Sequence, residues 1–251
     1  MILSEQEKAA HLAAFKNMSP SKKLEHVFTY YKLPIFLILL ACVVLGSVIH
    51  RSLTHKQPLL HLALVNVSVS DDTKKLLTSD FLTYADTDPK KNEVYLYQNL
   101  YLSENADTLN HEYAYASKMK VTGAISAKQM DLVLMNREGY DIFSNNGYLL
   151  DLSELLCSIA VESRYDEAFY TAMEQLLTDN KVVISDNSLE VMLGVADEEQ
   201  IITESVQNAI NVSALPIFKT AAFDGDVYLG IIANSDRTDT ALQYIGYLFS
   251  S

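Results

Sequence analysis

The sequence contains one uninterrupted apolar run, from Leu33 to Ile49, which reads LPIFLILLACVVLGSVI and carries no charge over 17 residues. Seventeen residues are just enough to cross the hydrocarbon core of a bilayer as a helix. Lys32 and Arg51 flank the run, and Pro34 stands in the first turn, where its missing N–H costs little. A buried core helix would normally keep a polar stripe, which this run lacks. The sequence therefore predicts a single transmembrane helix over residues 33–50.

The charges that flank this run indicate its orientation. The lysines before it are Lys16, Lys22, Lys23 and Lys32, whereas Arg51 and Lys56 follow it. Because positive residues are retained on the cytoplasmic side, we expect residues 1–32 to be a helical cytoplasmic segment. That segment is either a docking surface or, as we favour, a topology determinant lying on anionic lipid. Residues 51–59 would be a linker and residues 60–251 an extracellular domain of a single-pass cell-membrane protein.

A cleaved lipoprotein signal is the alternative anchor. Residues 39–42 (LLAC) loosely match the box at which bacterial lipoproteins are cut and acylated on cysteine, here Cys42. Against this, the leader would be 41 residues long, and residues 43–45 continue the apolar run where a lipoprotein usually turns polar. Both anchors hold the same domain at the same membrane face.

Charge is unevenly distributed along the chain. Residues 1–33 carry five Lys and three Glu, net +2, whereas residues 51–251 carry 14 Lys or Arg and 29 Asp or Glu, net −15. A body this acidic repels a phosphate backbone, so we expect no nucleic-acid partner. Two cysteines, one of them in the apolar run, also exclude a disulfide-stapled scaffold.

Residues 60–153 alternate between strand-like and helix-like patterns. Strands are predicted at 60–67, 93–97 and 131–135, and helices at about 70–84, 111–129 and 137–145. The order β-α-β-α-β-α implies parallel strands covered by helices. The sequence therefore predicts a doubly wound α/β lobe.

The C-terminal part is less regular. The predicted elements are a helix at about 166–178, strands at 181–185 and 191–195, a helix at 198–209, a hairpin turn at 222–228, a strand at 227–233 and a closing helix at 238–249.

Several stretches resemble a known family. Residues 125–135 (ISAKQMDLVLM), 140–143 (YDIF) and 147–153 (GYLLDLS) resemble the middle of type 2 periplasmic, or extracellular, solute-binding proteins. Residues 228–235 (YLGIIANS) and 241–245 (ALQYI) are similar to that family's closing strand and helix. The resemblance covers most of residues 60–251.

The N-terminal motifs narrow this resemblance. Met18-Ser19, Lys22-Lys23 and Tyr30-Tyr31-Lys32, together with the apolar run, resemble small membrane-anchored proteins of Gram-positive bacteria that carry a reduced form of the domain and are often thought to act beside ABC transporters. The resemblance implies a first lobe of about 60–153 and 221–251. Only about 154–220 remain for the second lobe, so we expect it to be small and the cleft to be shallow.

The expected fold places a ligand site where strand carboxyl ends meet helix N-termini. Ser70 and Asp71 follow the first predicted strand, and Asn136 and Tyr140 follow the third. These four residues are the predicted ligand-binding residues. Each also has an ordinary structural interpretation, as a helix cap or a packed aromatic side chain.

The sequence predicts no enzyme. Of the histidines only His61 and His111 lie in the soluble domain, and His61 falls inside a strand, so a Ser/His/Asp arrangement would depend on His111 alone. His111-Glu112 lacks the second His of a helical zinc site. Residues 86–91 begin like a calcium loop but place lysines where a ligand and the turn glycine belong. We therefore expect no catalytic residue, no metal and no cofactor.

The sequence thus predicts a membrane-anchored extracytoplasmic binding protein. It would be an accessory or substrate-capturing subunit associated with an ABC-type transporter, with the membrane, the transporter complex and a small solute or peptide as partners. The alternative is a protein–protein interaction or signalling module that uses a degenerate binding-protein fold and takes no small ligand. A hydrolase with an unrecognised site is the third hypothesis.

Overall fold

The computed structural model describes residue 19 and residues 32–54, 56–104, 110–161, 164–195, 198–219 and 225–250. They belong to two compact units, Met1–His55 and Lys56–Ser251. The helices expected within residues 1–31 lie outside the described residues, as do residues 222–224 of the hairpin turn expected at 222–228.

The first unit contains helix α3, Lys32–Thr54, which includes the whole apolar run. The large apolar side chains described between Leu33 and Leu45 are all exposed. None of the helices in the described part of the chain has the length and apolarity that crossing a membrane requires. The transmembrane helix stays a prediction.

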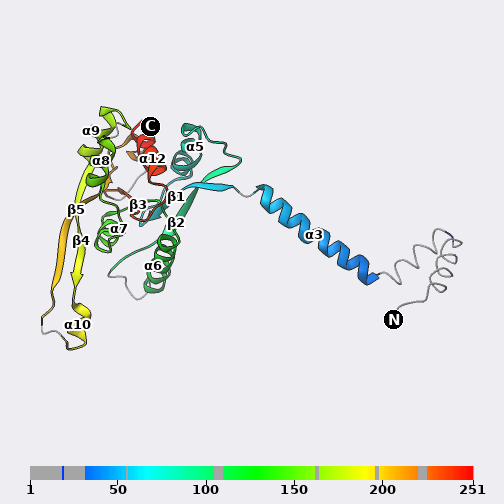
Figure 1. Ribbon diagram of the computed structural model, residues 1–251, viewed down its shortest axis with the longest axis horizontal. Helices are drawn as coiled ribbons and strands as arrows, with labels where there is room; N and C mark the ends of the chain where they lie inside the picture. Colours follow the sequence, from blue (N-terminus) through cyan, green and yellow to red (C-terminus); the bar gives the residue numbers. More distant parts are fainter. Residues whose placement is uncertain are drawn as a thin grey trace. The chain divides into compact units, whose positions relative to one another are not determined.

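The second unit is an α/β domain built on one mixed six-stranded sheet (Figure 1). The strands are β1 (Gln57–Val65), β2 (Asn92–Leu100), β3 (Leu132–Met135), β4 (Leu177–Asp186), β5 (Ile201–Asn211) and β6 (Tyr228–Ile231), in the spatial order β2-β1-β3-β6-β5-β4. β1 pairs in parallel with both β2 and β3, as predicted for the N-terminal half. The strands β6, β5 and β4 are added in antiparallel pairs.

Helices cover both faces of this sheet. They are α4 (Asp71–Lys75), a π-helical turn (Leu76–Asp80), α5 (Phe81–Tyr84), α6 (His111–Ser126), α7 (Arg137–Asn145), α8 (Leu152–Val161), α9 (Glu167–Leu176), α10 (Ser188–Met192), α11 (Pro216–Lys219) and α12 (Thr238–Ser250). The predicted helix at 70–84 is thus three consecutive helical segments, and the closing helix is confirmed.

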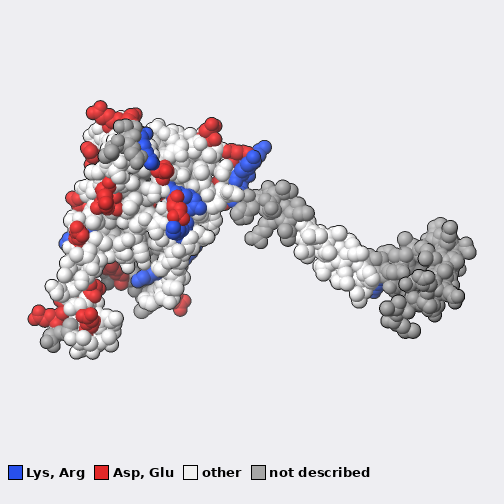
Figure 2. Space-filling model, in the orientation of Figure 1, with Lys and Arg blue, Asp and Glu red and all other residues white. Residues whose placement is uncertain are grey.

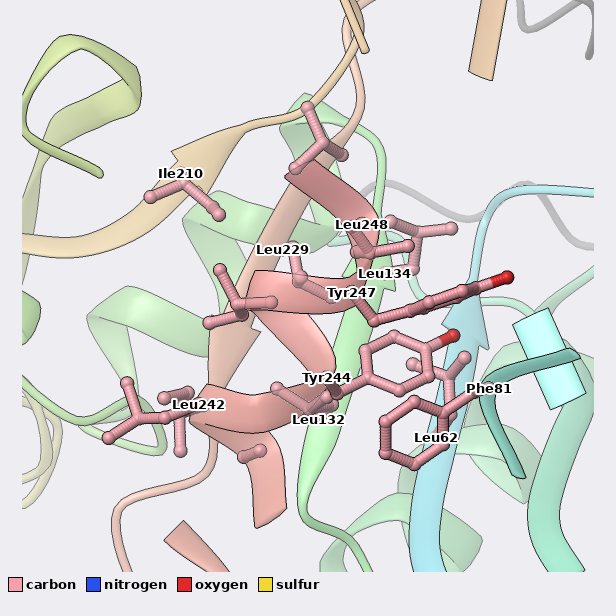
Figure 3. Close-up of a cluster of buried hydrophobic side chains, with 14 of the residues drawn as sticks. Leu62, Phe81, Leu132, Leu134, Ile210, Leu229, Leu242, Tyr244, Tyr247 and Leu248 are labelled. Carbon is pink, nitrogen blue, oxygen red and sulfur yellow. The ribbon is translucent and has the colours of Figure 1, made fainter. Parts of the chain in front are cut away.

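Alternate residues of the central strands face two separate apolar cores. Leu62 and Leu132 pack with α5 and α12, and Figure 3 shows Phe81 and Tyr244 beside them. The rings of Phe81 and Tyr244 meet edge to face at 4.7 Å. Val133, the neighbour of Leu132, packs instead in the core formed with α6 and α7. Burial on both faces explains why these strands read as continuous apolar runs.

Two predictions for the C-terminal part are wrong. Residues 191–195, predicted as a strand, form the end of α10 and a turn, and residues 198–209, predicted as a helix, mostly form β5. β5 pairs with β4 from Leu177↔Ile210 to Asp186↔Ile201. β-branched residues such as Ile202 and Thr203 lose side-chain freedom in a helix, so strand pairing overrides the weak helical periodicity.

The paired strands β4 and β5 extend past the rest of the sheet as a ribbon with α10 at its end (Figure 1). Only Ile210 and Asn211 of β5 pair with β6. We call residues 182–206 the arm. They belong to the segment 154–220, and through β5 that segment is continuous with the single sheet.

Candidate functional site: a cleft at the carboxyl edge of the parallel strands

The carboxyl ends of β1, β2 and β3 are tied together by Asn66, the residue directly after β1. Its Nδ2 donates to the Leu102 carbonyl at 2.6 Å and to Asn136 Oδ1 at 3.2 Å. Its Oδ1 accepts from the Leu102 N–H at 2.8 Å. Asn66 has φ +57°, a left-handed conformation that Asn tolerates better than most residues. One amide therefore holds three strand ends in register.

Asn136 and Ser70 both act as helix caps. Asn136 Oδ1 accepts from the Gly139 N–H at 2.9 Å at the start of α7, and Ser70 Oγ accepts from the Thr73 N–H at 3.1 Å at the start of α4. Asp71 is exposed, with its Oδ1 3.8 Å from Lys74 Nζ. In the structure, Ser70 and Asn136 satisfy N–H groups that a helix start leaves unpaired.

Tyr140 is fully buried behind the edge. Its hydroxyl donates to the Thr178 carbonyl at 2.8 Å, and its ring stacks on Tyr228 with centroids 4.9 Å apart. The Arg137 guanidinium lies 5.3 Å from the Tyr140 ring centroid and 5.7 Å from that of Tyr228, within cation–π range. Burial raises the pKa of the Tyr140 phenol well above its ordinary value, so the hydroxyl stays a proton donor.

The structure thus brings two of the four predicted site residues together. Asn136 caps α7, and Tyr140 lies within that helix. Ser70 and Asp71 stand at the start of α4, and none of the hydrogen bonds seen in the described residues joins them to Asn136 or Tyr140.

Two adjoining hollows open at this edge. One, of about 390 Å³, is lined by the segment after β2 and by α6 and α7. The other, of about 460 Å³, is lined by Glu104 and the first turns of α7. Both include Glu104 and Ile142. We call the pair the carboxyl-edge cleft; each hollow is within the size range of small-molecule sites.

The carboxyl-edge cleft carries groups of both charges. His111 and Lys118 of α6 line the first hollow, and Arg137, Glu138 and Asp141 of α7 line the second. Arg137 Nε lies 3.0 Å from Asp141 Oδ1, which orients the guanidinium. Such a surface suits a ligand that itself carries both a carboxylate and an ammonium group.

The cleft residues were only partly open to prediction from the sequence. Arg137 and Glu138 directly follow Asn136. They would have been predicted if every residue in the first turn of the helix after a parallel strand had been included as a candidate. Lys118 lies inside α6, and its place depends on how that helix packs. Asn66 falls inside the first predicted strand, at 60–67, so the sequence pattern did not mark it; the structure ends β1 at Val65, and Asn66 follows β1 as Asn136 follows β3.

A second polar cluster is buried at the opposite end of β3. Asp131 Oδ2 accepts from the His61 N–H at 2.8 Å and lies 3.1 Å from His61 Nδ1. Its Oδ1 accepts from Ser235 Oγ at 2.7 Å and lies 3.4 Å from an Arg237 nitrogen. The serine contacts the carboxylate, whereas a Ser-His-Asp triad needs the imidazole between them. In the described ranges, no group of three or more His, Cys, Asp or Glu is placed to hold a metal ion.

The fold and the cleft define an α/β domain with a ligand-sized cleft where its parallel strands end. No protein family matches the chain, and neither the curated proteins nor the solved structures give a match. The resemblance to type 2 solute-binding proteins stays a prediction.

Proposed function

We propose that the chain is a membrane-anchored extracytoplasmic binding protein, an accessory or substrate-capturing subunit of an ABC-type transporter. It takes a small polar solute or peptide in the carboxyl-edge cleft and performs no chemistry on it. The observation that carries this proposal is the convergence of cationic and acidic side chains at the edge where three parallel strands end. Open α/β sheets bind ligands at this edge because helix N-termini converge there.

The chemistry of the lining favours a ligand of the amino acid or peptide class. Lys118 and His111 offer donors to a carboxylate, and the N-terminus of α7 adds partial positive charge on the same side of the sheet. Glu104 and Glu138 offer acceptors to an ammonium group. A ligand with one charge only would leave part of this lining unpaired, which costs affinity.

The exposed apolar side chains of α3 support the anchor. Leu33, Phe36, Ile38 and Val43 are each more than half exposed, and no charge interrupts the run. Apolar surface on all sides of a helix is typical of a segment in lipid. The proposed protein is single-pass, and the excess of lysines before the apolar run favours an N-terminus in the cytoplasm and an α/β domain outside.

Ligand binding is tested with the full-length protein in mild detergent. Thermal unfolding is followed with each standard amino acid and a dipeptide library, and any ligand found is titrated by calorimetry. Lys118→Ala should weaken binding by about tenfold, equivalent to about 1.4 kcal/mol. Lys120→Ala is the matched control, because Lys120 is on the same helix but lies over the Tyr97 ring. Equal effects of the two variants, or no ligand in the panel, would refute the cleft as the site.

The transporter association needs a separate test. We would purify the full-length protein from its native host and identify what accompanies it by mass spectrometry. A permease and its ATPase in a stable ratio would support an accessory subunit. A solitary protein would contradict this part of the proposal and leave solute binding to be judged by the titration.

A further inference from the structure

At the end of the arm, residues 182–206, side chains of the described residues hydrogen-bond to the backbone. Asn187 Oδ1 accepts from the Gln200 N–H at 2.5 Å, and Asn187 Nδ2 donates to the Glu198 carbonyl at 3.0 Å. Asp186 Oδ1 accepts from the Ser188 N–H at 2.8 Å, where α10 begins. These bonds join the end of β4 to the start of α10 and to the residues before β5.

The surface of the arm is unusually apolar for this domain. Seven large hydrophobic side chains of the arm are exposed by 43% to 76%: Ile184, Leu189, Met192, Leu193, Val195, Ile201 and Ile202. Elsewhere in the described part of the second unit, the exposed large hydrophobic residues are four tyrosines and Met119. All the exposed Leu, Ile and Val side chains of that part therefore gather on the arm. Clustering of this kind is typical of an interaction surface, whereas single exposed apolar residues are ordinary.

The border of the surface is acidic. Residues 182–206 contain six Asp or Glu and neither Lys nor Arg. Figure 2 shows uncharged atoms around α10 at the end of the arm, with acidic side chains next to them. The surface is thus an apolar patch with negatively charged side chains around it and no positively charged ones within residues 182–206.

We propose that the arm docks into an apolar groove bordered by Lys and Arg on a different protein. The negative charge of the arm favours a partner of this kind over a second copy of the chain or a lipid surface. A second copy would bring another acidic arm or an acidic body, since residues 51–251 are net −15, and like charges in an interface oppose association. An anionic lipid surface repels the same carboxylates. A basic border around an apolar groove pairs with the acidic border and removes Leu189, Met192 and Leu193 from water.

This inference goes beyond solute binding. No residue of the arm lines either hollow of the carboxyl-edge cleft. Docking by the arm and binding in the cleft are therefore separate properties, and either can fail without the other.

The test uses the full-length chain in membranes of its native host. A benzophenone amino acid replaces Leu189, which lies at the end of the arm on α10, and cross-linked peptides are identified by mass spectrometry after irradiation. We expect cross-links to one other protein, in an apolar segment with Lys or Arg close by. The same benzophenone at Met119, an exposed residue of α6, is the matched control and should give no such product.

Two double variants then separate packing from charge. Met192→Gln with Leu193→Gln should lower the cross-linking yield about tenfold, as should Glu190→Lys with Glu199→Lys. Glu154→Lys with Glu174→Lys makes the same charge change on α8 and α9, and its yield should stay within about twofold. All these side chains are exposed, so thermal unfolding of each variant should match the parent protein.

Three outcomes would overturn the proposal. Cross-links to lipid would make the arm a membrane contact, and cross-links to a second copy would make it a self-association surface. If the cross-linking yield with a partner is the same in both double variants as in the parent protein, the arm lies near that partner but does not bind it.

Discussion

Replacing the buried carboxylate of Asp131 with an amide tests what holds the amino end of β3. Asp131 has no exposed surface, and its two oxygens face four donors. Two of these donors belong to His61, one to Ser235 and one to Arg237. Asp131→Asn keeps the shape and one acceptor oxygen, but its NH₂ group must face two donors.

The magnitude follows from those two donors. A buried donor without an acceptor costs about 1–3 kcal/mol. We therefore expect Asp131→Asn to lower the free energy of unfolding by about 3 kcal/mol at pH 7. For a domain of this size, that corresponds to a fall of about 6–12 °C in Tm.

The effect should depend on pH in a defined direction. Burial alone would raise the pKa of Asp131, but the hydrogen bonds from His61 and Ser235 and the charge of Arg237 outweigh it and lower the pKa below the ordinary Asp value. A lowered pKa contributes stability that is complete above the pKa of the unfolded state and is lost as pH falls through the folded value. The difference between parent and variant should be constant from pH 7 to about 5 and shrink below about pH 4.

The measurement is urea unfolding of the full chain in mild detergent, followed by near-ultraviolet circular dichroism of the tyrosines. Asp236→Asn is the control, because that carboxylate is exposed and lies 2.6 Å from Lys128 Nζ, an arrangement worth at most about 1 kcal/mol. A loss below about 1 kcal/mol for Asp131→Asn at pH 7 would refute the reasoning, as would a difference that grows toward low pH.

Two further predictions concern the packing of the sheet. Tyr140→Phe deletes the hydroxyl that donates to the Thr178 carbonyl and should cost about 1–2 kcal/mol in urea unfolding; no change would mean that water replaces the bond. Gly230→Ala would place a Cβ 2.9 Å from Leu149 Cδ2 and should cost about 1–3 kcal/mol, whereas Gly123→Ala on α6 meets nothing within 4 Å and should raise stability by up to about 1 kcal/mol. Shifts of Tm in the same direction for both glycine variants would contradict this.

The elements that the sequence predicts well are those whose local signals agree with their packing. The strands β1 and β3 are apolar on both faces because both faces are covered. Helix α7 matches its predicted bounds, since Asn136 caps its start and Gly147, with φ +65°, follows its end. Such signals lie within a few residues of the element that they specify.

The arm and the cleft depend on contacts between distant residues. The helical periodicity of residues 198–209 is outweighed by pairing with β4, about 25 residues earlier in the chain. Lys118 lines the cleft because α6 packs beside β2, and no pattern in α6 itself marks the face that does so. Sequence reasoning therefore located the edge of the sheet that carries the cleft but not the full set of side chains that line it.

Helix α7 links the two proposed surfaces, and this decides which variants are informative. Asp141 lines the cleft, yet its Oδ1 also accepts from Asn180 Nδ2 at 3.0 Å, and Ser144 Oγ donates to the Lys181 carbonyl at 2.7 Å where the arm begins. A substitution in α7 would disturb both surfaces, so its effect could be assigned to neither.

Lys118 of α6 and Met192 of α10 lie outside this network. Loss of solute binding in the Lys118 variant with intact cross-linking, and the reverse in the variant at Met192, would show that the surfaces act independently. Loss of both in either variant, with thermal unfolding unchanged, would instead show that the two surfaces are coupled.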